Sequence, residues 1–188
     1  MRIITSNLNG IRSAATKGFF DWMRRQKADV ICLQEVKAQE TDLTDAMRAP
    51  KGYHGYFNCA EKKGYAGVAL YCRRAPDKVQ VGFGSKEHDD EGRYLRADFG
   101  GLSVVSLYLP SGSAGAHRQE SKYRFMEHFL PVLKQNLKSG REKSRNPKKR
   151  ALCFLVRGDD NKGWHVVEAP FLGAAAKATK PPPEIFMG

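Results

Sequence analysis

Three polar residues at the ends of predicted strands could form a reactive centre: Asn7, Glu35 and Tyr108. A carboxylate at the edge of a dry core is costly unless it is paired, so we expect Glu35 to contact a metal ion or a cation such as Lys37. One carboxylate beside a basic surface that attracts phosphates suits Mg²⁺. Taken singly, the residues have simpler explanations: Glu35 caps a turn, Asn7 is a turn residue before Gly10, and Tyr108 is a core residue.

The elements that must position these residues are short apolar strands. A strand at 2–6 precedes Asn7, and the run Val-Ile-Cys-Leu at 30–33 stops at Gln34-Glu35, which places Glu35 at a strand end. A helix is predicted between them, at 19–26. The remaining predicted strands have spacing typical of antiparallel structure and lie at 53–57, 67–72, 78–83, 94–99 and 102–109. The middle of the chain is therefore predicted to be a meander.

The C-terminal third changes character along its length. Apolar residues at helical spacing predict a helix over 118–137, with Pro131 expected to kink it or to start a second helix. A basic stretch follows, then one apolar run at 151–156, then a segment rich in Gly, Ala and Pro. We expect the residues after 161 to be poorly ordered.

The composition describes one soluble domain. The chain has 188 residues, of which 41% are hydrophobic and 28% charged, which excludes a disordered or collagen-like chain. Its longest apolar run is far short of the eighteen or so residues that cross a bilayer, and its first residues do not resemble a secretion signal. Cys32, Cys59, Cys72 and Cys153 have no metal-site spacing, so we expect reduced core thiols in a cytoplasmic protein.

The positive charge is concentrated in one segment. The net charge is +12, and residues 134–150 contribute +7 of it, from eight basic residues and one acidic residue. This excess favours a polyanionic partner, because each phosphate that is neutralised releases counterions. A solvated basic face without a partner explains the charge equally well.

Five short sequence blocks occur together between Asn7 and Gly112. They are Asn7-Leu8-Asn9-Gly10-Ile11-Arg12, Leu33-Gln34-Glu35-Val36-Lys37, Lys63-Gly64-Tyr65-Ala66-Gly67-Val68-Ala69, Glu91-Gly92-Arg93 and Tyr108-Leu109-Pro110-Ser111-Gly112. In order and spacing they resemble the motifs of the exonuclease III family of AP endonucleases, within the endonuclease/exonuclease/phosphatase superfamily. The resemblance covers residues 1–142 almost continuously. It implies an α/β protein with the DNase I-like four-layer α/β sandwich.

The resemblance also implies roles for individual residues. Glu35 matches the Mg²⁺ ligand of the family, and Asn7 helps to hold the network of metal, water and phosphate. Tyr108 matches the tyrosine that reaches the scissile phosphate. The blocks containing Lys63, Tyr65 and Arg93 border the DNA-binding face in the family.

After residue 142 the resemblance weakens. Gly158-Asp159-Asp160-Asn161 has the form of the family's G-D-x-N block, in which the Asp (here Asp159) orients or deprotonates the attacking water and the Asn (here Asn161) assists. An extra basic stretch at 143–150 precedes it, and Arg157 interrupts the strand end. The alternative is that everything from about residue 143 is unrelated sequence, as a frameshift would produce.

No Ser-Asp-His block of the family follows. We therefore expect residues 1–161 to form a partial domain with the second sheet largely missing, and residues 162–188 to form a divergent tail. A half sandwich exposes an apolar sheet face and is expected to be unstable or to depend on a partner.

The function that the resemblance implies is a DNA-repair nuclease that depends on Mg²⁺, or alternatively on Mn²⁺. It would act as a 3′–5′ exonuclease and AP endonuclease on double-stranded DNA with abasic sites or 3′ ends, as a monomer and away from membranes. The alternative from a different class is a catalytically impaired remnant that at most binds nucleic acid. A phosphatase of the same superfamily fits the sequence blocks less well.

Overall fold

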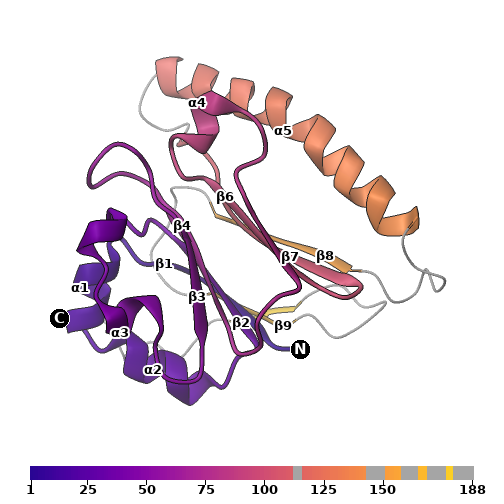
Figure 1. The fold of residues 1–188 in the computed structure, drawn as a ribbon. Helices are drawn as coiled ribbons and strands as arrows, with labels where there is room; N and C mark the ends of the chain where they lie inside the picture. The colour runs from indigo at the N-terminus through magenta and orange to yellow at the C-terminus, as the bar shows by residue number, and fades with distance from the viewer. Residues whose placement is uncertain (112–115, 143–150, 158–164, 169–176, 180–188) are drawn as a thin grey trace.

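The computed structural model describes residues 1–111, 116–142, 151–157, 165–168 and 177–179, with side chains described up to residue 136, except 116 and 118. Two sheets make up its centre (Figure 1). The first has the strand order β10-β9-β1-β2-β4-β3, and the second β5-β6-β7-β8. The strands are β1 Ile3–Asn7, β2 Val30–Gln34, β3 His54–Asn58, β4 Val68–Cys72, β5 Lys78–Val81, β6 Tyr94–Phe99, β7 Leu102–Tyr108, β8 Ala151–Arg157, β9 His165–Glu168 and β10 Lys177–Thr179.

Helices cover the outer faces of both sheets, so that the described residues form four layers (Figure 1). The helices are α1 Ile11–Thr16, α2 Phe19–Gln26, α3 Asp45–Arg48, α4 Lys86–Asp89 and α5 Ala116–Glu142, with a short 3₁₀ turn at Glu40–Asp42. The α1–α3 layer lies on the first sheet, and α5 lies along the second (Figure 1). The predicted four-layer α/β sandwich is confirmed.

The alternation of side chains along each strand builds this layering. Ile3 and Val30 point between the two sheets, where they join a cluster with residues of β6 and β7 such as Leu95 and Val104. The next residue of β1, Ile4, points the other way and packs under α1 and α2. Apolar strands buried on both faces read as continuous hydrophobic runs, which is why the run at 30–33 shows no alternation of polarity.

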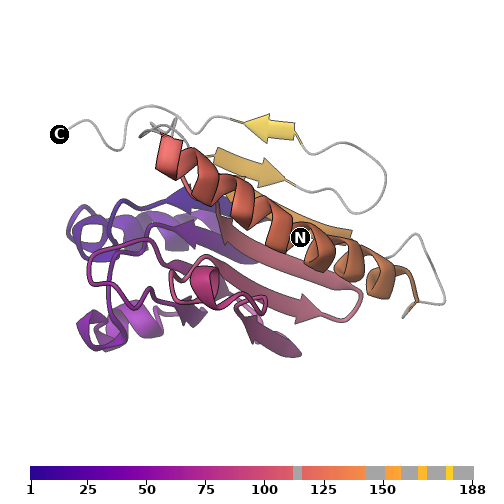
Figure 2. The same ribbon diagram turned by 90° about the horizontal axis from the view of Figure 1, so that it is seen from above.

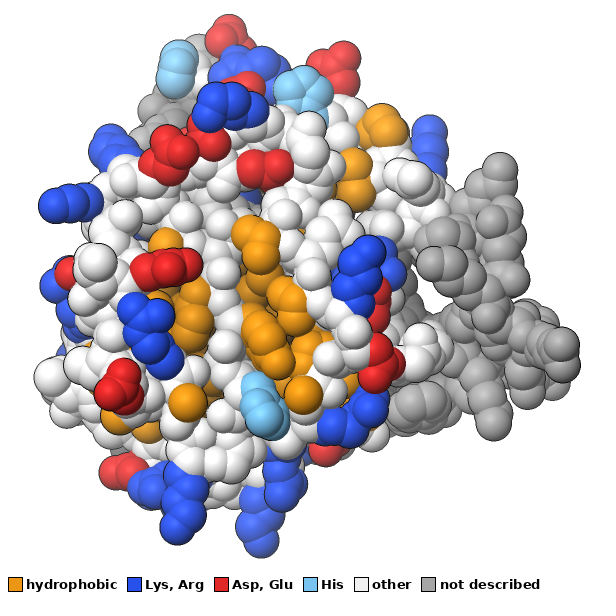
Figure 3. Space-filling model, in the orientation of Figure 1, with side chains coloured by type: hydrophobic (Ala, Val, Ile, Leu, Met, Phe, Trp, Pro, Cys, Tyr) orange, Lys and Arg blue, Asp and Glu red, His pale blue; other side chains and the backbone are white. Residues whose placement is uncertain are grey.

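The second sheet has its own outer core. Tyr94 and Val105 pack against Phe125 and Phe129 of α5, together with Phe83 from the segment before α4. Most of the rings meet edge to face, including Phe83 and Phe125 with centroids 5.5 Å apart. Figure 3 shows a further patch of hydrophobic side chains in the middle of the face seen in Figure 1, surrounded by charged ones.

A buried polar network joins the two sheets next to the carboxyl end of β2. Gln34 is fully buried, accepts from Thr5 Oγ1 at 3.2 Å, and donates through Nε2 to Ser106 Oγ at 3.2 Å. Ser106 Oγ donates in turn to the Leu33 carbonyl at 3.0 Å. Because a buried amide without partners is costly, this network fixes how β2 and β7 align and therefore where the residues after them lie.

Three features differ from the sequence-based predictions. The predicted meander is divided between the sheets: β3 and β4 pair in the first, whereas β5, β6 and β7 form an antiparallel meander in the second. Pro131 lies inside one helix, α5, and so does not start a second one, while the kink stays a prediction; its side chain faces solvent, where water can satisfy the carbonyl left without an N–H partner. The described part of the second sheet has four strands, more than the sequence-based prediction anticipated.

The C-terminal residues contribute strands to both sheets. β8 pairs in parallel with β7 from Ala151 opposite Leu102 to Arg157 opposite Tyr108. β9 pairs antiparallel with β1, and β10 lies outside β9 at the edge of the sheet (Figure 2). Two of these strands fall within the segment after 161 that was expected to form a divergent tail.

The cysteines behave as the composition predicts where they are described. Cys32 and Cys72 are buried and Cys59 is half-buried, and no disulfide joins these three described cysteines. Burial raises the pKa of Cys59 to about 11 and that of Cys72 to about 12, so both are protonated and unreactive at neutral pH. Within the described ranges, every helix is either too short or too polar to pass through a bilayer.

Gly92 offers a test of how tightly the segment after α4 is packed. Its φ is +63°, and a Cβ there would lie 2.6 Å from the Asn58 carbonyl oxygen. Gly100 has nearly the same φ, +61°, with open space around it. Gly92→Ala is expected to lower the free energy of unfolding by about 3 kcal/mol, and Gly100→Ala by about 1 kcal/mol, because only the first adds a backbone clash to the strain. Chemical denaturation measures both; equal losses would show that the neighbouring strand yields to the methyl group.

Candidate active site

The predicted residues Asn7, Glu35 and Tyr108 meet at one point of the structure. β1 and β2 are parallel and end together, with Asn7 opposite Gln34, so Glu35 follows directly at the shared carboxyl edge. Asn7 donates through Nδ2 to Glu35 Oε1 at 2.5 Å. Tyr108, at the end of β7 in the other sheet, donates its hydroxyl to the same oxygen at 3.0 Å. The centre therefore needs both sheets.

The other oxygen of this carboxylate is held by a cation. Lys37 Nζ lies 2.8 Å from Glu35 Oε2 and also donates to Asn9 Oδ1 at 2.6 Å. The Glu35 side chain is only 14% exposed, so the ion pair is shielded from water. The predicted pairing of Glu35 with a basic side chain such as Lys37 is confirmed.

Opposing effects set the ionisation of Glu35. Burial is the largest effect and raises its pKa, but the hydrogen bonds from Lys37, Asn7 and Tyr108 and the charge of Lys37 outweigh it. The net result is a pKa below the ordinary value of a glutamate. Glu35 is therefore an anion at neutral pH despite its burial.

The backbone around Glu35 is held in an unusual conformation. Glu35 and Lys37 have φ values of 52° and 48°, which non-glycine residues seldom adopt. Hydrogen bonds fix the segment on both sides: Gly10 N donates to the Glu35 carbonyl at 2.8 Å, and Val36 N donates to the Gly67 carbonyl at 3.1 Å. Three of the sequence blocks thus interlock through their main chains, and the left-handed turns aim the Glu35 and Lys37 side chains at each other. Strain of this kind is typical of functional sites.

Arg93 is a buried clamp rather than a surface residue. It is 2% exposed, and its Nε lies 2.5 Å from Glu91 Oε2. Its two terminal nitrogens donate to the Tyr108 carbonyl at 3.1 Å and to the Tyr65 hydroxyl at 2.9 Å. The guanidinium also lies over both rings, with centroid distances of 5.7 Å to Tyr65 and 5.1 Å to Tyr108. In this conformation Arg93 positions two tyrosines and is closed to a phosphate.

The other predicted residues are distributed differently. Lys63 is exposed and lines a hollow together with Glu61 and Phe57. Tyr65 is partly buried against Arg93. Asp159 and Asn161 lie outside the residues that the structure describes.

Sequence reasoning missed two parts of the centre. Glu91, which pairs with Arg93, was given no role in the sequence analysis. A glutamate two positions before an arginine was the available signal for such a pair. Asn9 was likewise given no role, yet it links Lys37 to Asn7, whose Oδ1 accepts from the Asn9 N–H at 2.9 Å.

The donor set around Glu35 fits a divalent cation such as Mg²⁺. An ionised carboxylate has about four acceptor positions, and three donors occupy no more than three of them here. The remaining acceptor position belongs to a hard anionic oxygen, the type of ligand atom that Mg²⁺ prefers. Asn7 Oδ1 is already bonded to Asn9, so Asn7 would orient the carboxylate and Glu35 would supply the ligand atom.

Comparison with known proteins agrees with this geometry. The model of the endonuclease/exonuclease/phosphatase family matches residues 4–166. The chain belongs to this family. The matched range extends past residue 143 to residue 166.

Individual members of the family are similar over much of this chain. An exodeoxyribonuclease of Bacillus subtilis is 36% identical over 134 residues, which are 71% of this chain and 52% of the relative. The DNA repair nuclease APEX1 of Danio rerio is 39% identical over 135 residues, 71% of this chain and 44% of the relative. The solved structure of an AP endonuclease from Archaeoglobus fulgidus superimposes with a TM-score of 0.64 at 30% identity, covering 72% of this chain and 51% of that one. The chain thus spans about half the length of these members.

Proposed function

We propose that this chain is a DNA-repair nuclease of the exonuclease III type, which hydrolyses phosphodiester bonds at abasic sites and at 3′ ends and depends on Mg²⁺ or Mn²⁺. The observation that carries the proposal is the Glu35 carboxylate, ionised although largely buried and held by Asn7, Lys37 and Tyr108. A buried anion at the shared edge of two sheets is suited to bind a cation that in turn attracts a phosphate.

Each residue of the centre has a role in this proposal. Glu35 would hold the ion, which when bound supplies a Lewis acid for the phosphoryl oxygens. Lys37 and Asn7 keep the carboxylate in place through hydrogen bonds. The Tyr108 hydroxyl, whose residue Arg93 fixes through the main chain and ring, would turn its single proton from Glu35 to the scissile phosphate when DNA is bound.

The attacking water would be oriented by Asp159 with the help of Asn161. The support for this assignment is the parallel pairing of β8 with β7: Arg157 lies opposite Tyr108 where both strands end, and the Gly-Asp-Asp-Asn sequence follows β8 in the chain. Side chains that follow neighbouring parallel strands emerge at the same edge of the sheet. Hydrolysis needs a group that orients or deprotonates the attacking water, and an acidic side chain at this edge of the sheet would serve as that group.

DNA would contact the exposed Lys63 and the partly buried Tyr65 beside the centre. The net charge of +12 favours the association, because phosphate contacts release counterions. The partner would be double-stranded DNA, bound by a monomer.

A second candidate is nucleic-acid binding without hydrolysis. It is favoured by the same positive charge, which attracts a polyanion whether or not a bond in it is broken. The two candidates differ in one measurable property: both bind DNA, but only the first breaks it.

An incision assay separates them. The substrate is an end-labelled duplex with a single abasic site, incubated with the purified chain in Mg²⁺ or in EDTA, while binding is followed by fluorescence anisotropy. The nuclease proposal expects cleavage on the 5′ side of the abasic site in Mg²⁺ and none in EDTA. Binding without cleavage in either buffer would establish the second candidate, and neither binding nor cleavage would contradict both. Hydrolysis of a small phosphate ester in place of DNA would indicate a phosphatase.

A further inference from the structure

A second group of metal-ligating side chains lies away from Glu35, on the outer side of the second sheet. Glu87 and His88 come from α4 and His128 from α5, and one ligand atom of each lies within 4.8 Å of the others. Two imidazoles and one carboxylate are a ligand set typical of zinc and related first-row metals. Ligand atoms in a tetrahedral zinc site lie roughly 3.3 Å apart, so modest side-chain rotations would close the group around an ion.

His88 provides an independent observation. It is fully buried, and neither of its ring nitrogens has a hydrogen-bond partner among the residues that the structure describes. Buried polar groups are almost always satisfied, and leaving one unpaired costs about 1–3 kcal/mol. The ring is stacked on Phe83, meets Phe125 edge to face with centroids 4.9 Å apart, and lies against the His128 ring with centroids 5.4 Å apart. A metal ion would give this orphaned imidazole the partner that the protein does not.

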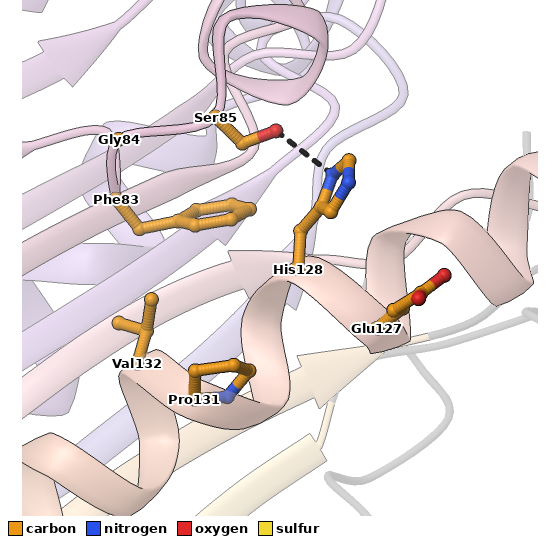
Figure 4. A pocket seen from close by; sticks show the side chains of 7 residues that line it. All are labelled: Phe83, Gly84, Ser85, Glu127, His128, Pro131 and Val132. Carbon is orange, nitrogen blue, oxygen red and sulfur yellow. Dashed lines mark hydrogen bonds between the residues drawn. The ribbon is translucent and has the colours of Figure 1, made fainter.

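His128 is held in an orientation that suits metal binding. Its Nδ1 lies 3.1 Å from Ser85 Oγ, which fixes the ring and leaves the other nitrogen for an ion (Figure 4). Metal-binding histidines are commonly held in this way by a partner on the second nitrogen. Figure 4 also shows that His128 borders a pocket, lined by Phe83, Ser85 and Val132 among others.

Arg124 is the one competitor for the site among the described contacts of Glu87. Its Nη2 donates to Glu87 Oε1 at 2.9 Å. Both side chains are more than two fifths exposed, at 42% and 43%, and exposed pairs contribute little to stability because water screens them. A divalent ion can therefore displace Arg124 from one carboxylate oxygen or share the carboxylate with it.

We propose that Glu87, His88 and His128 bind a transition-metal ion of the zinc type, which joins α4 to α5. Glu91 and Arg93 follow α4 directly, so the ion would steady the segment that carries the clamp on Tyr65 and Tyr108. The site does not depend on the proposed nuclease function, since it shares no residue with the centre at Glu35.

Isothermal titration of ZnCl₂ into protein freed of metal with EDTA tests the proposal, with thermal unfolding measured with and without Zn²⁺. One high-affinity Zn²⁺ per chain and a raised melting temperature are expected. His128→Ala and Glu87→Gln should each weaken binding at least about 10-fold and remove the thermal shift, whereas His54→Ala, which replaces an exposed histidine of β3, should change neither. Both test variants alter exposed residues, so folding is expected to persist, and His88 need not be touched.

Zn²⁺ that binds at Glu35 or at the cysteine thiols would also contribute heat to the titration. Glu35→Gln should retain the high-affinity event, because the proposed ligands are intact. The proposal is overturned if wild-type protein shows no such event, if His128→Ala binds as tightly as wild type, or if Glu35→Gln alone abolishes binding.

Discussion

Glu35→Gln is expected to lower the rate of metal-dependent incision at least about 100-fold, since even partners one step removed from a metal ligand cost 10–100-fold when they are replaced. Glutamine has nearly the same volume but no anionic oxygen for a hard cation. It also meets three donors, Lys37, Asn7 and Tyr108, with one acceptor oxygen and an amide NH₂ that cannot accept. The loss therefore has two measurable parts, a lower rate at saturating Mg²⁺ and a higher Mg²⁺ concentration at half-maximal rate.

The control for this variant is Glu120→Gln, which removes the same charge from an exposed position on α5. It should incise like the wild type and respond equally to Mg²⁺. Circular dichroism should show that both variants are folded. An incising Glu35→Gln chain with an unchanged Mg²⁺ response would refute the assignment of Glu35 as the metal ligand.

Arg93→Met is expected to lower the free energy of unfolding by about 3 kcal/mol and the incision rate by about 10²-fold. The guanidinium is buried, and its removal takes the cation from Glu91 and one hydrogen-bond donor each from the Tyr108 carbonyl and the Tyr65 hydroxyl. Methionine fills much of the space, so the loss reports the polar contacts more than a cavity. Urea denaturation and single-turnover incision measure the two effects.

Arg74→Met is the matched control, because Arg74 is 66% exposed and forms an ion pair with Asp77 at 3.7 Å. Its loss of stability should not exceed about 1 kcal/mol. The result also decides between two roles of Arg93. If Arg93→Met unfolds like the wild type but binds DNA more weakly and with a flatter salt dependence, Arg93 contacts phosphate, as the sequence resemblance implies.

Much of the centre could be predicted from the sequence for a simple physical reason. A strand that is apolar on both faces and ends in a carboxylate identifies both the edge of a core and a charge that needs a partner. The run before Glu35 has this form, and the structure supplies the expected cation in Lys37. The order and spacing of the five blocks predicted the four-layer sandwich correctly, because blocks that resemble a known family carry its fold with them.

Local sequence could not predict which sheet each strand joins. The strands at 53–57 and 78–83 look alike as isolated runs, yet β3 pairs in the first sheet and β5 in the second. Strand pairing depends on contacts between residues far apart in the chain, and local propensity carries no information about them. Local sequence is equally uninformative about Pro131, because whether a proline breaks a helix depends on whether the helix face that carries it is exposed to water.

What the sequence by itself determined is the type of the polar groups at the strand ends and the strands that lead to them. Only the tertiary structure decided that Arg93 is a buried clamp, that Gln34 and Ser106 join the sheets, and that His88 has no hydrogen-bond partner within the described part of the chain. The physical reason is that the burial of a polar side chain is not a property of its own segment. It depends on which elements pack over that side chain and on whether they bring a donor or an acceptor within about 3 Å.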